Sequence, residues 1–302
     1  MGKEVLLPEI LLQRGITLDK NVFRYRPDNL KVFWENGTEK YKNGFALDEI
    51  ELFQIWHSSV KLLNDPFEIY AHANKNEGDN LTDEEFYKIW YEQSLRVNKP
   101  AVSLAPETGL RDFFNLNKDN IIATIKRVMN RGGYFKEFID DVRTAICLSS
   151  FTNVCDSRLM WGYYCNGLSG ICIIYNREKL KKSKIILEDV NYTPDGYQVD
   201  VYNMIFNYRG GYKSEVLMQI PRVKHLDWKH ESEQRSLITF QGDVRESGIM
   251  ASLEQSCVDG VIIGKNCHNE TKLRLRRLAK KLRFKVFMAD ADLEHYQVKI
   301  YQ

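Results

Sequence analysis

Short apolar runs recur along the whole chain, and their length limits what the chain can fold into. They cover residues 21–26, 144–151, 170–175, 260–264 and 285–288. Runs of four to eight residues that are rich in β-branched and aromatic side chains and bounded by turn residues indicate strands rather than helices. Since helical segments separate them and no internal repeat is present, we predict an α+β fold.

The segments between these strands carry helical signals. The clearest is Thr82-Asp83-Glu84-Glu85, where an N-cap residue is followed by acids in the first turn. We predict helical structure over residues 47–70, 82–96, 118–140, 200–220 and 269–283. The most economical interpretation is one domain over residues 1–302, with a helical insertion at about 70–140 and a basic helix at about 269–283.

Composition excludes several classes of protein. The chain has 302 residues, a formal net charge of +2, 43% hydrophobic and 28% charged residues. These values exclude wholesale disorder, a disulfide-stapled miniprotein and a histone-like polycation. No apolar run approaches the roughly 20 residues that span a bilayer, and the N-terminal residues do not form a signal peptide. With six cysteines and no Cys-x-x-Cys pair, we predict reduced thiols and a cytoplasmic protein with no membrane partner.

The acid pair Glu231-Ser-Glu233 directly precedes an apolar strand. If this segment is extended, period-2 alternation places both carboxylates on one face. Two acids at this spacing repel, so the pKa of one should be raised unless a cation lies near. Arg235 continues the same face and is the predicted cation. The alternative is a solvated strand entrance without chemistry.

Two other strand ends carry groups that can bind a ligand. Ser150 and Thr152 alternate with Phe151, so two hydroxyls share one face. The first strand ends in Tyr25-Arg26, and an arginine at a strand end can bind phosphate or carboxylate through two parallel hydrogen bonds. A surface charge and ordinary strand-end hydroxyls are the alternative explanation.

In chain order, aromatic-Arg, Ser-x-Thr and Glu-x-Glu resemble the Arg–Ser–Glu signature of the ADP-ribosyltransferase superfamily. The resemblance implies an enzyme with a split antiparallel β-sheet that binds NAD as co-substrate. It assigns catalysis to Glu233, beside the ribose, and to Glu231, at the acceptor. It also implies NAD-binding roles for Tyr25, Arg26, Ser150, Thr152, Trp161 and Tyr164, with core packing as the alternative for Trp161 and the neighbouring tyrosines. We expect Glu233→Gln to leave folding nearly unaffected, because a carboxylate in a cleft contributes little packing.

A second resemblance covers more of the chain. Tyr25-Arg26, Asn64-Asp65-Pro66-Phe67-Glu68, Met160-Trp161-x-x-Tyr164 and Glu231-x-Glu233-x-Arg235 look like the conserved boxes of an uncharacterised bacterial family. This resemblance implies no established activity, but it suggests that the same positions line one site. The Asn-Asp-Pro turn is explained equally well by an Asx side chain that stabilises it, so we interpret the turn as structural.

The segment Lys272–Lys285 contains eight basic residues and no acid. Leu275, Leu278 and Leu282 recur at helical spacing, which predicts an amphipathic helix with a basic outer face. Such a one-sided cluster favours contact with a phosphate backbone, and the candidate nucleic-acid-binding residues are Arg274, Arg277 and Lys281. A solvated helix is the alternative.

Other chemistries lack their motifs. The chain contains no HExxH, Gly-x-Gly-x-x-Gly, Walker or Gly-x-Ser-x-Gly motif, so we predict no metal site, dinucleotide fold, P-loop or serine nucleophile. The leading hypothesis is an NAD-dependent ADP-ribosyltransferase that modifies RNA, DNA or protein. The resemblance further implies a bacterial toxin or phage-defence effector held off by an antitoxin-like inhibitory protein. The alternatives are a non-catalytic nucleic-acid-binding or interaction module and, third, a metal-dependent nuclease.

Overall fold

The computed structural model describes residues 6–63, 65, 67–69, 71–73, 81–97, 99–130, 133–199, 218–239 and 247–302. The chain divides into two compact units. The first unit comprises Met1–Leu63, Ile146–Val190 and Asp227–Gln302, and the second comprises Asn64–Ala145 and Asn191–Leu226. The helical insertion predicted at about 70–140 falls within the second unit, which also takes in a later segment.

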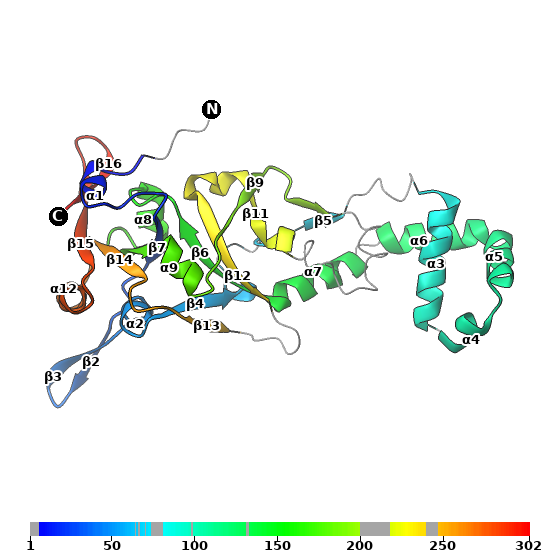
Figure 1. Ribbon diagram of the computed structural model, residues 1–302, viewed down its shortest axis with the longest axis horizontal. Coiled ribbons are helices and arrows are strands. Elements are labelled where there is room, and N and C mark those ends of the chain that lie inside the picture. The colour runs from blue at the N-terminus through cyan, green and yellow to red at the C-terminus, as the bar shows by residue number, and fades with distance from the viewer. Residues whose placement is uncertain are drawn as a thin grey trace. The chain divides into compact units, whose positions relative to one another are not determined.

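The first unit is built on a large, mostly antiparallel sheet (Figure 1). Its described strands are β1 (Asn21–Arg26), β4 (Gln54–Ser59), β6 (Ile146–Thr152), β7 (Ile171–Asn176), β8 (Glu188–Asp189), β12 (Glu233–Thr239), β13 (Gly248–Ser252), β14 (Val258–Gly264), β15 (Lys285–Asp292) and β16 (Gln297–Tyr301). Their order is β13-β4-β6-β1-β7-β14-β15-β16, with β12 on β6 and β8 on β12. Only β14 and β15 pair in parallel among these strands. The predicted α+β class is therefore confirmed.

The sheet divides between β6 and β1. These two strands share a single registered pair, Phe23 with Thr152. By contrast, β1 pairs with β7 over its whole length, and β12 pairs with β6 from Glu233–Thr152 to Thr239–Ile146. The two halves of the sheet therefore meet at one residue pair, and within one of them β4 joins β6 through two pairs.

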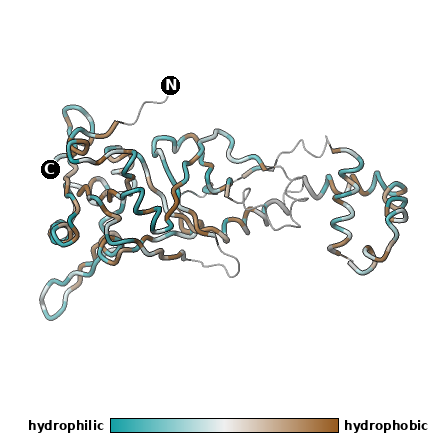
Figure 2. The backbone as a smooth tube through the Cα atoms, viewed as in Figure 1, coloured by the Kyte–Doolittle hydropathy of each residue, from teal (hydrophilic) through white to brown (hydrophobic). Residues whose placement is uncertain are grey.

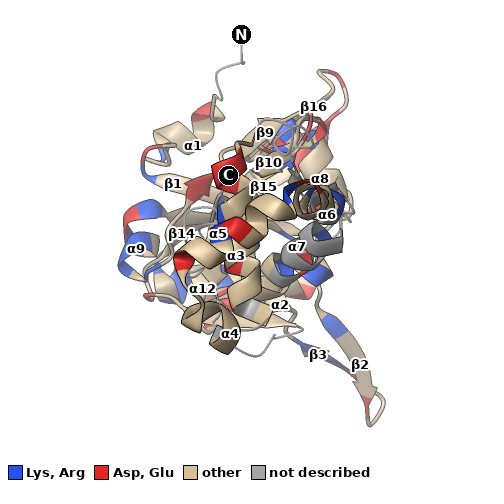
Figure 3. Ribbon diagram, turned by 90° about the vertical axis from the view of Figure 1, so that its right-hand side faces the viewer, with Lys and Arg blue, Asp and Glu red and all other residues tan. Residues whose placement is uncertain are grey.

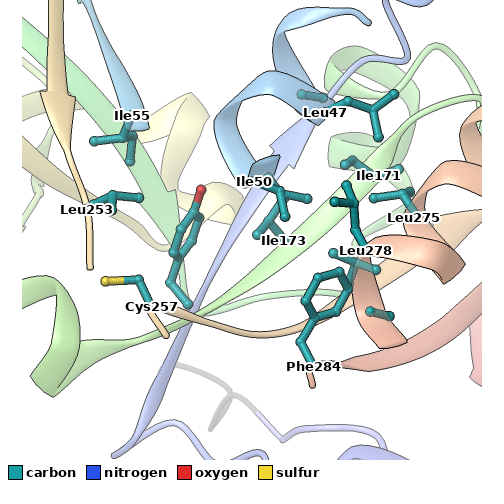
Figure 4. Packing of buried hydrophobic residues seen from close by; sticks show 14 of the residues in the cluster. Leu47, Ile50, Ile55, Ile171, Ile173, Leu253, Cys257, Leu275, Leu278 and Phe284 are labelled. Atoms are coloured by element: carbon teal, nitrogen blue, oxygen red, sulfur yellow. The ribbon is translucent and has the colours of Figure 1, made fainter. Parts of the chain in front are cut away.

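Two hydrophobic clusters cover the two faces of this sheet. Ile171, Ile173 and Val261 point into one cluster, which α2 (Phe45–Glu51) and α12 (Asn269–Leu282) complete (Figure 4). The intervening residues Cys172 and Ile174 belong to the other, which α1 (Glu9–Gln13) and α8 (Arg158–Tyr164) cover. Because both faces are buried, the central strand β7 carries apolar side chains on both faces instead of alternating with polar ones (Figure 2).

The remaining elements of the first unit lie around this sheet. They are the 3-10 segments η1 (Val60–Leu62) and η5 (Leu226–Glu231, which starts at the boundary), the helix α9 (Arg177–Lys182), and the hairpin β2 (Lys31–Glu35) with β3 (Thr38–Lys42). The basic helix is confirmed as α12, with Leu275 and Leu278 buried.

The second unit contains helices and two small parallel strand pairs. Its described elements are α3 (Asp83–Val97), α4 (Lys99–Leu104), α5 (Glu107–Leu116), α6 (Lys118–Asn130), α7 (Gly133–Ala145), β5 (Ala71–Ala73), β9 (Asn191–Thr193), β10 (Tyr197–Val199), η4 (Ile220–Arg222) and β11 (Val223–His225). Here β10 pairs with β5, and β11 with β9. Phe86, Tyr87, Ile89 and Phe114 form its own aromatic core.

Two of the predicted helices differ from the structure. The helix expected over 47–70 ends at Glu51, and β4 follows, because Gln54–Ser59 alternates between buried and half-buried residues with the strand period of two. The segment expected over 118–140 forms two helices, α6 and α7. Most of the helix expected over 200–220 lies outside the described residues.

Candidate functional site

The pairing of β12 with β6 brings two of the predicted motifs together. Glu233 lies opposite Thr152, and Arg235 lies opposite Ser150. In an antiparallel pair, directly opposed side chains share one face, so the Ser-x-Thr and Glu-x-Glu motifs meet across two neighbouring strands. Thr152 is buried and Ser150 is exposed.

Glu231 reaches the same place by a different backbone route from the one predicted. It ends η5, and Ser232 has a φ of 46°, so the chain turns sharply before β12 starts at Glu233. The simple period-2 argument for the acid pair is therefore wrong. Thr152 holds the turn, since its hydroxyl donates to the carbonyl of Glu231, while the Asn153 amide donates to the Ser232 carbonyl at 3.2 Å.

Each of the two carboxylates has a defined partner. The Tyr164 hydroxyl donates to Oε1 of Glu231 at 2.5 Å, from a helix whose N-cap is the side chain of Ser157. Arg235 forms a two-pronged ion pair with Glu233, with Nε–Oε1 and Nη2–Oε2 distances of 2.9 and 3.0 Å. The prediction that Arg235 is the local cation is confirmed.

We call the group of Thr152, Tyr164, Glu231, Glu233 and Arg235 the carboxylate site. Both glutamates and Arg235 are buried, and Arg235 is fully so. A buried ion pair of this kind depends on both partners, because removing one leaves an uncompensated charge. The expectation that Glu233→Gln leaves folding nearly unaffected is therefore wrong, since Arg235 would lose its anionic partner.

Tyr25 and Trp161 pack against each other on the same face as Thr152. Their rings meet edge to face with centroids 5.3 Å apart, and the Trp161 indole donates to the Cys155 carbonyl at 2.9 Å. Trp161 is only 1% exposed, so the structure assigns it core packing instead of the predicted stacking role. Burial raises the pKa of Tyr25, whose hydroxyl has no hydrogen-bond partner among the described residues.

Arg26 lies on the opposite face of the sheet from Glu233. It alternates with Tyr25, and its Nε is 3.2 Å from Oε2 of Glu49 on α2. It also lies three residues beyond the Phe23–Thr152 pair, which is about 10 Å along the strand. Arg26 therefore does not share a face with Ser150 and Glu233, because strand alternation turns the arginine away.

A second buried polar group, which the sequence did not reveal, surrounds Arg26. We call Arg24, Arg26, Glu49, His57 and Tyr175 the arginine cluster. Oε1 of Glu49 accepts from the Tyr175 hydroxyl at 2.5 Å, and the Nε of Arg24 lies 3.2 Å from the same oxygen. The one available signal was a charged residue, Arg24, inside an otherwise apolar strand.

Further contacts tie the arginine cluster to the strands on both sides. The Nη2 of Arg24 donates to the Trp56 carbonyl on β4 at 3.1 Å, and its guanidinium lies 5.5 Å from the Phe151 ring centre. His57 Nε2 is 3.0 Å from the Ser236 hydroxyl. Burial lowers the pKa of His57 to about 4, and the charge of Arg24 acts in the same direction. His57 is therefore neutral at physiological pH.

One of the three predicted nucleic-acid-binding residues of the basic helix is engaged in contacts within the protein. Arg274 pairs with Glu270 at 2.8 Å and donates to the side chain of Asn43 and the carbonyl of Tyr41. This engagement argues against a free phosphate contact for Arg274. Arg277 and Lys281 are exposed, as predicted.

The turn at residues 64–68 supports its structural interpretation where it is described. The Phe67 amide donates to the Asp65 side chain at 2.9 Å, and the Glu68 amide donates to the Asp65 carbonyl at 3.1 Å. This is the Asx-stabilised turn expected, although Asn64 and Pro66 lie outside the described residues. Glu68 belongs to the second unit, where its Oε2 lies 3.8 Å from Nζ of Lys224.

The described part of the chain has no feature of a metal site, a disulfide or a membrane-spanning helix. No three or more His, Cys, Asp or Glu side chains there are grouped to hold a metal ion. The six cysteines are buried, and none of them forms a disulfide. Over the same residues, no helix combines the length and apolar character needed to cross a membrane.

A protein-family model matches part of the chain. The family is described as "Protein of unknown function (DUF2971)", and the match covers residues 160–236. This segment includes Tyr164, Glu231, Glu233 and Arg235, four of the five members of the carboxylate site. No curated protein and no solved structure matches the chain.

Proposed function

We propose that this protein is an NAD-dependent ADP-ribosyltransferase, with nucleic acid or protein as the acceptor. The observation that supports the proposal is the order of the three motif strands. β12, β6 and β1, which carry Glu-x-Glu, Ser-x-Thr and Tyr-Arg, are neighbours in that order, and the sheet divides between β6 and β1. A split sheet with these strands at its division is what the family resemblance requires.

The carboxylate site has the chemistry for this reaction. As the bond between nicotinamide and ribose breaks, positive charge develops on the ribose, and a buried carboxylate beside it stabilises that charge strongly. Glu233 is held for this role by Arg235 and by the register with Thr152. Glu231 accepts the proton of the acceptor group as its new bond to the ribose carbon forms, and nicotinamide leaves with the electrons of the broken bond.

NAD fits only in part the face of the sheet that carries the carboxylate site. Glu231 and Glu233 suit the ribose, and the buried Tyr25 hydroxyl, without a partner among the described residues, offers one further polar group on the same face. Arg26 does not suit the diphosphate from that face, because it is paired with Glu49 on the other side. The proposal therefore rests on the carboxylates and assigns no contact to Arg26.

Nicotinamide release and acceptor labelling, measured in parallel, test the proposal. Glu233→Gln removes the charge that faces the ribose, so we expect both rates to fall by about 10²–10³. Glu231→Gln should suppress labelling but leave some hydrolysis of NAD. Glu254→Gln, an exposed glutamate of the same unit, is the matched control.

Because Glu233→Gln also weakens a buried ion pair, its folded fraction must be verified by circular dichroism before the rates are compared. A folded Glu233→Gln protein that releases nicotinamide at the wild-type rate would refute the catalytic role. A wild-type protein that consumes no NAD with any acceptor would favour the alternative of a non-catalytic binding module.

A further inference from the structure

The β2–β3 hairpin exposes almost all of its side chains. Every residue of Lys31–Lys42 is exposed except Tyr41, and Trp34 is 72% exposed. The turn is well defined, because Asn36 and Gly37 have φ values of 50° and 70°, which suit a tight two-residue hairpin turn. An isolated two-stranded hairpin is marginally stable in water, so an exposed hairpin kept in this form suggests a binding function.

The two faces of the hairpin differ in chemistry. The register pairs Val32 with Tyr41 and Trp34 with Glu39, so one face is largely aromatic and apolar. The other face carries Phe33 and Thr38 with one acid, Glu35, and three lysines, Lys31, Lys40 and Lys42. Stacking platforms and cations thus occur on one small element.

The base of the hairpin is anchored to the basic helix α12. Arg274 donates to the carbonyl of Tyr41 at 3.3 Å and to the side chain of Asn43. The Tyr41 ring lies 5.5 Å from the ring of His268, which caps the helix. Hairpin and helix therefore form one continuous surface of the first unit.

Helix α12 continues this surface with positive charge. It contains six Lys or Arg and one acid, Glu270, which is paired with Arg274. Arg277 and Lys281 follow Arg274 by three and seven residues, so they lie on the same helical stripe, up to about 10 Å further along the axis. Both are exposed.

We propose that the β2–β3 hairpin and the Arg277–Lys281 stripe of α12 bind single-stranded nucleic acid. Trp34 offers a flat face on which an unpaired base stacks, and the basic side chains contact the phosphates. Bases in a duplex are already stacked and do not expose their faces, which favours a single strand over a duplex. The excess of positive charge complements a polyanion, which favours nucleic acid over an ordinary protein partner.

This inference deepens the proposed function by naming the class of acceptor, but binding requires neither NAD nor the carboxylate site. We would measure it by fluorescence anisotropy, with labelled single-stranded RNA and DNA of about 16 nucleotides and the corresponding duplex. Single strands should bind more tightly than the duplex. Trp34→Ala should weaken binding about 5- to 100-fold, whereas Trp34→Tyr should retain most of the affinity.

The salt dependence of binding measures the contribution of the charged residues of this surface. For single strands, each lost phosphate contact lowers the slope of log K against log salt by about 0.7, so Arg277→Ala with Lys281→Ala should lower it by about 1.4. Lys181→Ala with Lys182→Ala removes the same charge from another helix, α9, whose basic residues are blue in Figure 3, and should leave the slope nearly unchanged.

Wild-type affinity in Trp34→Ala, or equal loss in the α9 control, would overturn the proposal, and the first outcome would point to a protein partner for the hairpin. Trp34 is too exposed to support the core, so Trp34→Ala should keep its fold. The same binding assay with Glu233→Gln separates the two proposals. If this variant loses NAD chemistry but binds nucleic acid normally, the proposed binding role of the hairpin and the helix is not contradicted.

Discussion

The carboxylate site and the arginine cluster lie on opposite faces of one sheet, and their charges are balanced differently. In the carboxylate site, the anion Glu233 and the cation Arg235 are two residues apart on the same strand and engage each other through two hydrogen bonds. In the arginine cluster, Arg24 and Arg26 from β1 share one anion, Glu49 from α2. On one face the buried cation has its partner on the same strand, and on the other two cations depend on a single residue from another element.

The arginine cluster also leaves buried polar atoms unsatisfied. Within the described part of the chain, Nη1 of Arg24 and Nδ1 of His57 have no hydrogen-bond partner. Burial lowers the pKa of Arg24, and the charge of Glu49 opposes that shift. The difference between the two faces therefore predicts where a single substitution or a change of pH has its largest effect on stability.

The largest effect is expected for Glu49→Ala. Two arginines would lose their anion, and Arg24 is almost completely buried, so the free energy of unfolding should fall by about 3–5 kcal/mol. The Tyr175 hydroxyl would lose its acceptor at the same time. Urea denaturation followed by circular dichroism measures the change.

Two further variants help to interpret that loss of stability. Glu107→Ala removes a solvent-exposed partner of Arg111 and should change stability by less than about 1 kcal/mol. Arg24→Met combined with Glu49→Leu replaces the buried pair by apolar side chains and should recover much of the loss. If the double variant is no more stable than Glu49→Ala, the arginine cluster does more than balance charge.

A smaller effect is expected from pH, and it should come from His57. Its pKa is about 4 in the folded protein, against 6.5 for an unperturbed histidine side chain, so the unfolded chain binds the proton first as pH falls. Stability from this group is complete above about pH 6.5, declines as pH falls toward about 4, and is constant below. The full difference is about 3 kcal/mol.

His57→Gln removes the titration, so the difference in unfolding free energy between this variant and wild type should itself vary over that pH range. His295, an exposed histidine beside Asp292, provides the control substitution His295→Gln. A constant difference between wild type and His57→Gln from about pH 4 to 7 would contradict the burial argument.

The two faces also show what could be predicted from the sequence. The strands β1, β6, β7, β14 and β15 and the helix α12 follow directly from apolar runs and helical spacing, which are local properties. The ion pair of Glu233 and Arg235 is equally local, and the sequence predicted it. By contrast, β4 was mistaken for helix because its alternation is short and follows α2 closely.

Contacts between distant elements could not be predicted. Glu49 and Arg24 are brought together by packing of α2 on the sheet, and no spacing in the sequence encodes that distance. The face on which Arg26 lies depends on where β1 meets β6, since a shift by one residue exchanges the two faces. The φ of 46° at Ser232 is likewise visible only in the folded backbone.

The smallest expected effect concerns the hydroxyl of Tyr164. Tyr164→Phe removes its hydrogen bond to the Glu231 carboxylate and keeps the ring, so the free energy of unfolding should fall by about 1.5–3 kcal/mol. Because Glu231 is proposed to serve the acceptor, labelling should fall while nicotinamide release persists. Tyr163→Phe, on an exposed tyrosine of the same helix, should change neither quantity. Equal loss of labelling and nicotinamide release in Tyr164→Phe would show that Glu231 and Glu233 act as one unit, and would remove the division of roles proposed for them.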